Sequence, residues 1–173
     1  MSFGFKYETH RGAVPVYPGA STVGGMITST CVGYLCVAGS TVASVGQYGE
    51  IPINSTADMM KVKGIICDVP TNTTCGSTVP FYVYPIFPGD ILTANYSTTV
   101  ERSTGATSVI VSTNRGYFIG LGNSTDTILG RYVDPSLAST APGTTNCMLF
   151  RLIDLSTQND TVDVMVNSTH IAW

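Results

Sequence analysis

Hydrophobic and polar residues alternate most regularly near the C-terminal end of the chain. Every second residue from Val162 to Val166 is a valine, and the preceding stretch Cys147–Leu155 is largely apolar. The polar run Gln158–Asp160 separates the two. Because successive side chains of a strand point to opposite faces, a period of two indicates a half-buried β-strand. Residues 147–166 are therefore predicted to form a β-hairpin.

The rest of the chain contains further short β-branched or aromatic stretches, separated by Gly, Pro and Asn. These stretches predict strands at Met26–Cys31, Gly33–Val37, Thr41–Val45, Met60–Cys67, Val79–Ile86, Ile91–Tyr96, Ser108–Thr113, Gly116–Gly120 and Ile128–Val133. Proline cannot donate to a ladder, so Pro80 and Pro85 predict an edge or a bulge for their strand. Phe87–Asp90 is predicted as a turn, and Asp134–Thr145 as a loop.

About ten short strands without a convincing helix predict an all-β fold. Their spacing favours a single-domain antiparallel β-barrel or β-sandwich, and 173 residues suit one domain. Residues 1–22 precede the first Gly-separated strands and contain Pro15 and Pro18. We expect them to form an extended N-terminal arm, with residues 23–173 forming the β domain.

The chain carries little charge, and this narrows the classes of partner. Charged residues make up 11% of the sequence and hydrophobic residues 43%, with a formal net charge of −3. A low-charge surface rich in Ser and Thr favours an assembly in which neighbours cover part of the molecule. The eight Lys and Arg residues are scattered, which argues against nucleic-acid binding. No window has the roughly 18 to 20 uncharged apolar residues that a membrane span requires.

The residues that carry chemistry are sparse. His10 and His170 lie at opposite ends of the chain, and neither has a nucleophile motif around it. We expect no catalytic residue, metal or cofactor. A β-barrel hydrolase that uses an aspartate pair, including Asp90 or Asp154, remains an alternative.

Five cysteines occur without a CxxC pair, which disfavours a zinc site. Hairpin partners at the spacings of Cys31 and Cys36, or of Cys67 and Cys75, can come within bridging distance. Disulfides at these pairs are one interpretation. Buried, reduced thiols in a protein made in a reducing cytoplasm are the favoured one.

Three segments resemble a known class of protein: PIFPGDILTANYST, STNRGYFIGLG and NCMLFRLIDLSTQNDTVDVMVN. Together they are similar to the small all-β head decoration, or cement, proteins of tailed bacteriophages. The resemblance implies a non-enzymatic structural protein made in the cytoplasm of the host bacterium and located on the capsid surface of the virion. Its partner would be the major capsid protein, and the chain would form a dimer or trimer that bridges neighbouring capsomers and stabilises the expanded head.

Two sets of aromatic and aliphatic residues are candidates for partner contacts. Strand addition by the arm would use alternating side chains that order only on binding. The arm contacts are expected at Phe3, Phe5, Tyr7, Val14, Val16 and Tyr17. A second surface would use Tyr82, Tyr84 and Tyr96, of which the first two share a strand face. This second surface suits the alternative function, a phage tail, fibre or other particle component that binds a host glycan.

Overall fold

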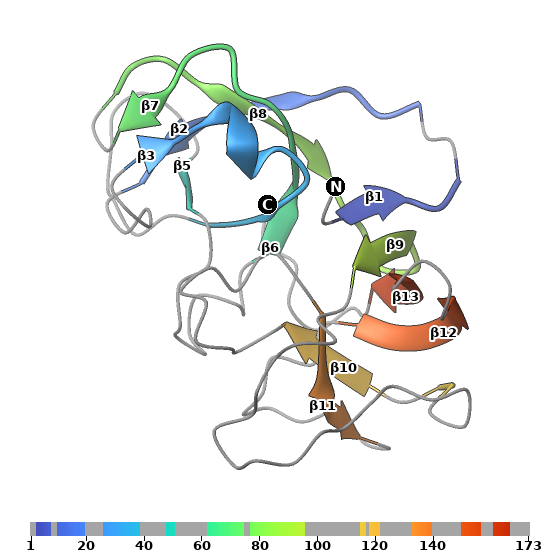
Figure 1. Cartoon of the computed structure of the whole chain (residues 1–173). Coiled ribbons are helices and arrows are strands. Elements are labelled where there is room, and N and C mark those ends of the chain that lie inside the picture. Colours follow the sequence, from blue (N-terminus) through green and yellow to red (C-terminus); the bar gives the residue numbers. More distant parts are fainter. Residues whose placement is uncertain are drawn as a thin grey trace.

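A computed structural model gives the three-dimensional structure of the chain (Figure 1). The residues that it describes are 3–7, 10–19, 26–38, 48–50, 62–74, 77–95, 115–116, 118–121, 133–139, 150–156 and 161–166. Almost all of these lie in strands, turns or extended connections. The predicted all-β class is therefore confirmed.

The described residues form thirteen strands and one short 3-10 helix. These are β1 (Phe3–Phe5), β2 (Val14–Pro18), β3 (Met26–Ile27), η2 (Ser29–Cys31), β4 (Leu35–Ala38), β5 (Tyr48–Glu50), β6 (Val62–Asp68), β7 (Thr73–Thr74), β8 (Phe81–Pro85), β9 (Ile91–Asn95), β10 (Phe118–Leu121), β11 (Val133–Ser139), β12 (Phe150–Ser156) and β13 (Thr161–Val166).

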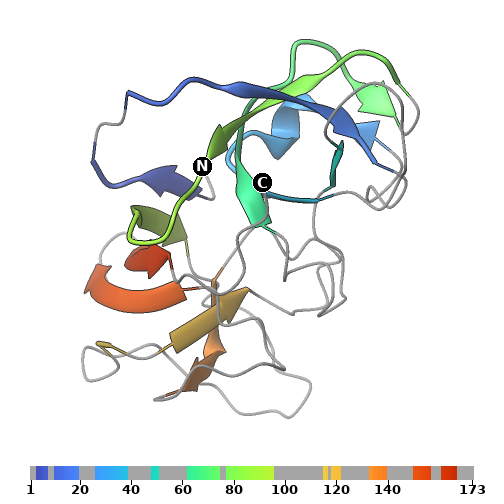
Figure 2. The same cartoon turned by 180° about the vertical axis from the view of Figure 1, so that it is seen from behind.

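The strands pair in two main groups. Six of them form a sheet in the order β1-β9-β13-β12-β10-β11, in which all pairs are antiparallel. Five others pair in the order β2-β5-β4-β6-β8, and β8 pairs with β2 in turn. The β2–β5 pair is parallel. Figures 1 and 2 show β1 and β9 on the side of the six-stranded sheet that faces β6 and β8.

The C-terminal hairpin follows the sequence pattern closely. β12 and β13 pair antiparallel from Phe150↔Val166 to Ser156↔Thr161. In β13, Val162, Val164 and Val166 are buried and the residues between them are half-buried. The period of two predicted this arrangement, so the hairpin is confirmed for the strands. Its turn lies outside the described residues.

β6 separates two apolar clusters. Val62 and Ile65 pack in the cluster that includes β9, β12 and β13, whereas Ile66 packs in the cluster around β2 and β8. A regular strand would place residues 62 and 65 on opposite faces. The β4–β6 register shifts between Cys36↔Gly64 and Val37↔Val62, which leaves Lys63 as an extra residue. This bulge changes the parity of β6 and allows one strand to serve both clusters.

Gly64 follows this bulge at a point where β6 and β8 approach closely. A Cβ at this position would clash with the carbonyl oxygen of Tyr84 and lie 2.7 Å from a methyl group of Val83. Only glycine fits the gap without moving the backbone of one strand.

Two sequence predictions about segments that contain proline need correction. β8 was expected at an edge or a bulge; it is not an edge strand, because it pairs with β6 on one side and β2 on the other, but its pairing with β6 shifts register between Ile66 and Asp68. Pro80 precedes the strand and Pro85 is its last residue, so its interior keeps its donors. Residues 134–139 were expected to be a loop, but they belong to β11. β11 is the outermost strand of its sheet, a position that tolerates Pro135.

Candidate interaction surface

The N-terminal segment is part of both strand groups. β1 pairs with β9, with Phe3 opposite Ala94 and Phe5 opposite Leu92. The Phe3 side chain is 1% exposed, and its ring stacks on Phe150 at a centroid distance of 5.6 Å. Phe3 N–H donates to the carbonyl of Gly33 over 2.9 Å. Further along the segment, β2 pairs with β8 and β5.

The expectation of an arm that orders only on binding is therefore corrected for residues 3–7 and 10–19. Phe3 and Val16 are buried in the chain's own core, and Val14 and Tyr17 are half-buried. The reason is that the alternation of apolar residues in this segment fits the chain's own sheets. Contact of the expected arm residues with a partner, and the boundary at residue 22, stay predictions.

Arg11 joins the segment between β1 and β2 to the turn between β8 and β9. Its guanidinium forms a two-pronged ion pair with Asp90, in which Nη2 donates to Oδ1 over 2.6 Å and Nη1 donates to Oδ2. Nη1 also donates to the carbonyl of Pro85 over 3.1 Å. The two side chains are only 27% and 13% exposed. Such fork-to-carboxylate geometry is both directional and charge-assisted.

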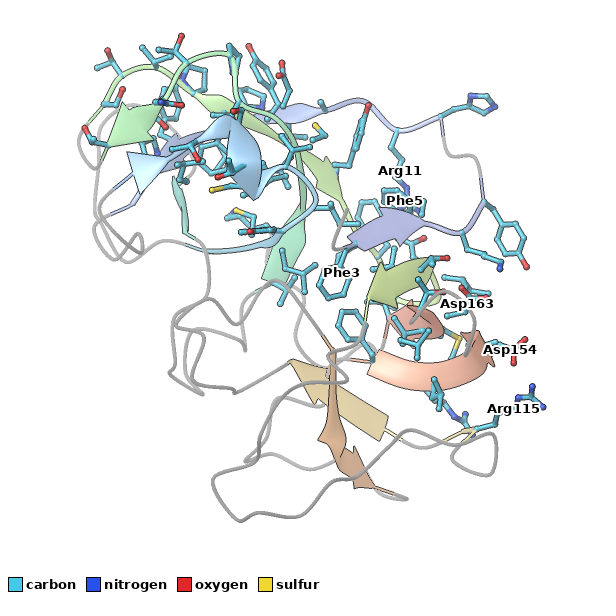
Figure 3. All side chains as sticks on the ribbon, viewed as in Figure 1. Phe3, Phe5, Arg11, Arg115, Asp154 and Asp163 are labelled. Atoms are coloured by element: carbon cyan, nitrogen blue, oxygen red, sulfur yellow. The ribbon has the colours of Figure 1, made fainter. Side chains whose placement is uncertain are left out.

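Two aromatic rings flank the guanidinium. Its central carbon lies 4.7 Å from the ring centroid of Phe87 and 5.5 Å from that of Phe5. Figure 3 shows Arg11 and Phe5 next to each other above β1. Asp90 Oδ2 also accepts the backbone N–H of Phe87 over 2.7 Å, which fixes the turn. We call Arg11, Asp90, Phe5 and Phe87 the arginine clasp.

The clasp keeps the arginine charged. The hydrogen bond to Asp90 raises the pKa of Arg11 above its ordinary value, against the opposing effect of burial. Asp90 compensates the charge of Arg11, and cation–π contacts with two aromatic rings stabilise it further. A partner can therefore cover this part of the surface without leaving an uncompensated buried cation.

An apolar hollow of about 200 Å³ adjoins the clasp. Phe5 belongs to both, and its ring meets Tyr84 edge-on at 6.4 Å with an interplanar angle of 70°. The hollow is lined by Phe3, Gly4, Phe5, Val32, Gly33, Ile65, Ile66, Cys67 and Tyr84. It lies where the edge of the six-stranded sheet meets β6 and β8. We call the clasp and the hollow together the aromatic–arginine surface.

Large apolar side chains are exposed on this surface. Phe87 is 45% exposed, and Tyr84 and Val32 are each 38% exposed. Along β8, Phe81 and Val83 are buried, whereas Tyr82 is half-buried and Tyr84 is exposed. The two tyrosines therefore share the other face of β8, as their spacing predicted. Tyr96, the third residue of that expected surface, lies outside the described residues.

Asp90 and Asp154, the carboxylates named above for hydrolysis, are engaged in ion pairs, and so is Asp163. Besides Asp90, Asp154 accepts from Arg115 over 2.5 Å and Asp163 from Lys6 over 2.7 Å. Asp154 and Asp163 face each other across β12 and β13. Figure 3 shows Arg115, Asp154 and Asp163 along one edge of the hairpin. Each of the two aspartates thus has a cation beside it, which offsets their mutual repulsion.

Lys6 is held at this edge by two groups. Its backbone N–H donates to the carbonyl of Ile91 over 2.9 Å, and its ammonium bonds Asp163. The hydrogen bond between the ammonium and Asp163, followed by the charge of Asp163, raises the pKa of Lys6 above 10.5. Thr93 also donates to Asp163 over 2.8 Å. Lys6 therefore continues the β1–β9 pairing beyond Phe5.

The cysteines in the described part of the chain are free thiols. Cys31 and Cys36 are buried and Cys67 is half-buried. Burial raises the pKa of the Cys67 thiol, which disfavours its reactive thiolate form. No group of three or more metal-ligating side chains occurs among the residues that the structure describes. Within these same residues, no helix is long and apolar enough to cross a membrane.

Sequence reasoning missed the arginine clasp. Arg11 and Asp90 are 79 positions apart, and each is an isolated charge in the sequence. The only signal was that Asp90 ends a turn-forming Phe-Pro-Gly-Asp run, where an aspartate commonly binds local backbone N–H groups.

Comparison with known proteins gives no relative of the chain: no family model matches it, and neither a curated protein nor a solved structure is significantly similar. The resemblance to phage decoration proteins therefore stays a prediction.

Proposed function

We propose that the chain is a non-enzymatic structural protein of a phage virion. It binds the outer surface of the capsid, bridges neighbouring capsomers and stabilises the expanded head. Its partner is the major capsid protein, and it acts as a homo-oligomer that is made in the host bacterial cytoplasm. In this proposal the two strand groups belong to one antiparallel β-barrel or β-sandwich domain.

The aromatic–arginine surface is the observation that carries the proposal. Phe, Tyr and Arg are enriched at the centres of protein interfaces, where a few well-packed side chains supply most of the affinity. Here Phe87 and Tyr84 are exposed, while Phe5 and Arg11 hold their positions. Little side-chain entropy is lost on binding because these contacts already exist in the free chain.

The neutralised clasp and the low charge of the chain favour a partner that is a folded protein surface. An apolar hollow of about 200 Å³ accommodates one or two side chains of such a partner. Many weak sites of this kind, repeated over a lattice, bind strongly together through effective concentration.

Copy number in purified particles from the source tests this function. Quantitative mass spectrometry should give this chain near a simple stoichiometric ratio with the major capsid protein, because only repeated lattice sites hold so many copies. A handful of copies per particle would point to a tail or vertex, and absence from particles would refute the virion role.

Variants then test the surface itself. Phe87→Ala should lower the affinity for undecorated capsids by roughly tenfold or more, because an aromatic anchor is lost. Co-sedimentation with the capsids measures this affinity. Ile153→Ala removes a side chain that is 39% exposed on β12, outside this surface, and is the matched control. Equal binding by both variants would exclude the aromatic–arginine surface as the capsid contact.

Glycan binding is the second candidate function, and the shared face of Tyr82 and Tyr84 favours it. Sugar rings stack on exposed aromatic faces, and Tyr84 is 38% exposed. In that case Tyr82→Ala or Tyr84→Ala should abolish a signal on a glycan array, whereas Tyr84→Phe should keep it. A wild-type chain that binds no glycan would remove this candidate.

A further inference from the structure

The hollow beside the arginine clasp is held open by packing elsewhere in the molecule. Its walls come from β1, the segment after η2, β6 and β8. On β1, the ring of Phe3 stacks on Phe150 in the core. The ring of Phe5 meets Tyr84 edge-on, and both of these rings line the hollow. The hollow therefore exists before a partner binds, and an occupant does not have to open it.

The backbone around the hollow is already engaged in hydrogen bonds. The N–H of Gly33 donates to the carbonyl of Ile66 over 2.8 Å, and the carbonyl of Gly33 accepts from the N–H of Phe3 over 2.9 Å. The N–H of Ile66 donates to the carbonyl of Tyr34 over 2.9 Å. A polar group that entered the hollow would lose its water without gaining a hydrogen bond from these donors.

The hollow also offers no charge to an occupant. Among the described residues that line it, none carries a charged side chain. Burial raises the pKa of the Cys67 thiol, so this lining group stays neutral near pH 7. Arg11 in the adjoining clasp is already compensated by Asp90. An ammonium or carboxylate would therefore leave water without meeting an opposite charge, and the occupant has to be uncharged and apolar.

The size of the hollow limits the occupant to one ring. Its volume is about 200 Å³; an apolar cavity of about 150 Å³ holds benzene, and sites for free ligands have roughly 300–1,000 Å³. The rim is open, because Val32 and Tyr84 are each 38% exposed. A free molecule would keep part of its surface in water. A side chain of a larger partner, which also contacts exposed groups such as Phe87, suits the hollow better.

The lining favours an aromatic ring over an aliphatic group. Phe5 and Tyr84 offer ring faces and edges, and such ring–ring contacts are worth roughly two- to tenfold in affinity. Gly4 and Gly33 have no side chains, so a flat ring can approach their backbone. Gly33 has a φ of 90°, which residues other than glycine rarely adopt.

We propose that the hollow receives one uncharged aromatic side chain, of the phenylalanine type, from the partner protein. This inference rests on the proposed function and gives the chemistry of the contact that the capsid protein would supply. The ring enters between Phe5 and Tyr84, and the exposed Phe87 of the clasp packs beside it.

Benzyl alcohol tests the site on the unmodified chain without a capsid. The ¹⁵N-labelled chain is titrated with it, and the amide signals of Gly4, Gly33 and Cys67 report on the hollow. They should shift together and saturate with a Kd in the millimolar range. Cyclohexylmethanol, whose ring is not aromatic, should bind roughly two- to tenfold more weakly. Absence of a saturable shift at these residues, or binding of cyclohexylmethanol that is equal or tighter, would overturn the proposal.

A variant that fills the hollow then tests the occupant. Val32→Trp places a large side chain at the rim, and Val79→Trp is the matched control, since Val79 is 42% exposed and does not line the hollow. Val32→Trp should weaken both benzyl alcohol binding and co-sedimentation with capsids at least tenfold. The control should change either by less than about twofold.

The two assays separate this inference from the proposed function. Capsid binding by Val32→Trp with the affinity of the natural chain would refute the aromatic occupant and leave the capsid function standing. If the natural chain itself does not bind capsids, the capsid function is refuted together with this source of the ring, and the titration alone decides whether the hollow takes an aromatic ring.

Discussion

At the scale of single residues, burial distinguishes the two arginine–aspartate pairs. Arg11 and Asp90 are 27% and 13% exposed, whereas Arg115 and Asp154 are 58% and 54% exposed. Water screens the second pair and leaves it little net energy. The first pair is shielded by Phe5 and Phe87 and also satisfies backbone groups, so its loss should be costly.

Asp90→Asn is therefore expected to lower the free energy of unfolding by about 1–3 kcal/mol, since it leaves Arg11 partly buried without its counter-charge. Asp154→Asn is the matched control and should cost about 0–1 kcal/mol. Urea unfolding of the three proteins measures both values. Equal, small losses would show that the clasp is no stronger than an ordinary surface ion pair.

Lys63 predicts a particular pH dependence of stability. Its side chain is 6% exposed at the β6 bulge, and burial lowers its pKa below the ordinary 10.5. Just below pH 10.5 the unfolded chain thus binds more protons at this lysine than the folded chain does. Stability from this group rises as the pH increases toward 10.5 and is lost as the pH falls.

Lys63→Met should remove this contribution while keeping the apolar stem. The variant's stability relative to the natural chain is expected to decline as the pH rises toward 10.5, because only the natural chain gains from deprotonation. Groups that do not interact with Lys63 titrate alike in both proteins and cancel in the difference. A difference that does not change with pH would contradict the lowered pKa.

At the scale of elements, the sequence predicted strands where one face is buried. The alternation in β8 and β13 appears directly as buried and exposed positions. The prediction of strands from the sequence failed at β11, because Pro135 and the serines are typical of a loop. In the structure this strand is held by hydrogen bonds to β10. Such an edge strand has little alternation of its own because its neighbour determines its pairing.

β1 shows a second limit of prediction from the sequence. Its aromatic alternation was recognised, but a sequence does not reveal whether the complementary surface belongs to the same chain or to a partner. Phe3→Ala should cost about 3 kcal/mol or more, the usual loss for a buried phenylalanine. Tyr7→Ala, at a 65% exposed position, should change stability by less than about 0.5 kcal/mol.

Thermal and urea unfolding of these two variants measure how far β1 belongs to the core of the free chain. An equally small effect of both would mean that β1 is detached in solution. The burial of Phe3 and Val16 also predicts that removing residues 2–17 would destabilise the fold itself, because both side chains and most of β2 would be lost.

At the scale of the whole molecule, the site was less predictable than the fold. Tyr82 and Tyr84 could be placed on one face from their spacing, whereas the arginine clasp and the hollow join residues 3–5, Arg11 and the segments 32–33, 65–67 and 84–90. Only the folded arrangement of the two strand groups brings these segments together. The composition nevertheless predicted a surface with few charges, because charged residues make up only 11% of the sequence.

If the chain binds capsids as proposed, this low-charge character predicts how the binding depends on salt. Raising the ionic strength from about 0.1 M to about 1 M shortens the screening length from roughly 10 Å to 3 Å, which weakens contacts between exposed charges. The Arg11 charge is already paired with Asp90 inside the clasp and flanked by two rings. Apolar contacts made by Phe87 and Tyr84 do not weaken with salt.

The dissociation constant for capsids should therefore change by less than about threefold over this range. Co-sedimentation at a series of salt concentrations measures it, with Phe87→Ala as the variant that should bind weakly at every concentration. A steep, continuous loss of affinity with salt would instead mean that the chain's exposed charges make the contact, because ionic binding alone follows the screening length.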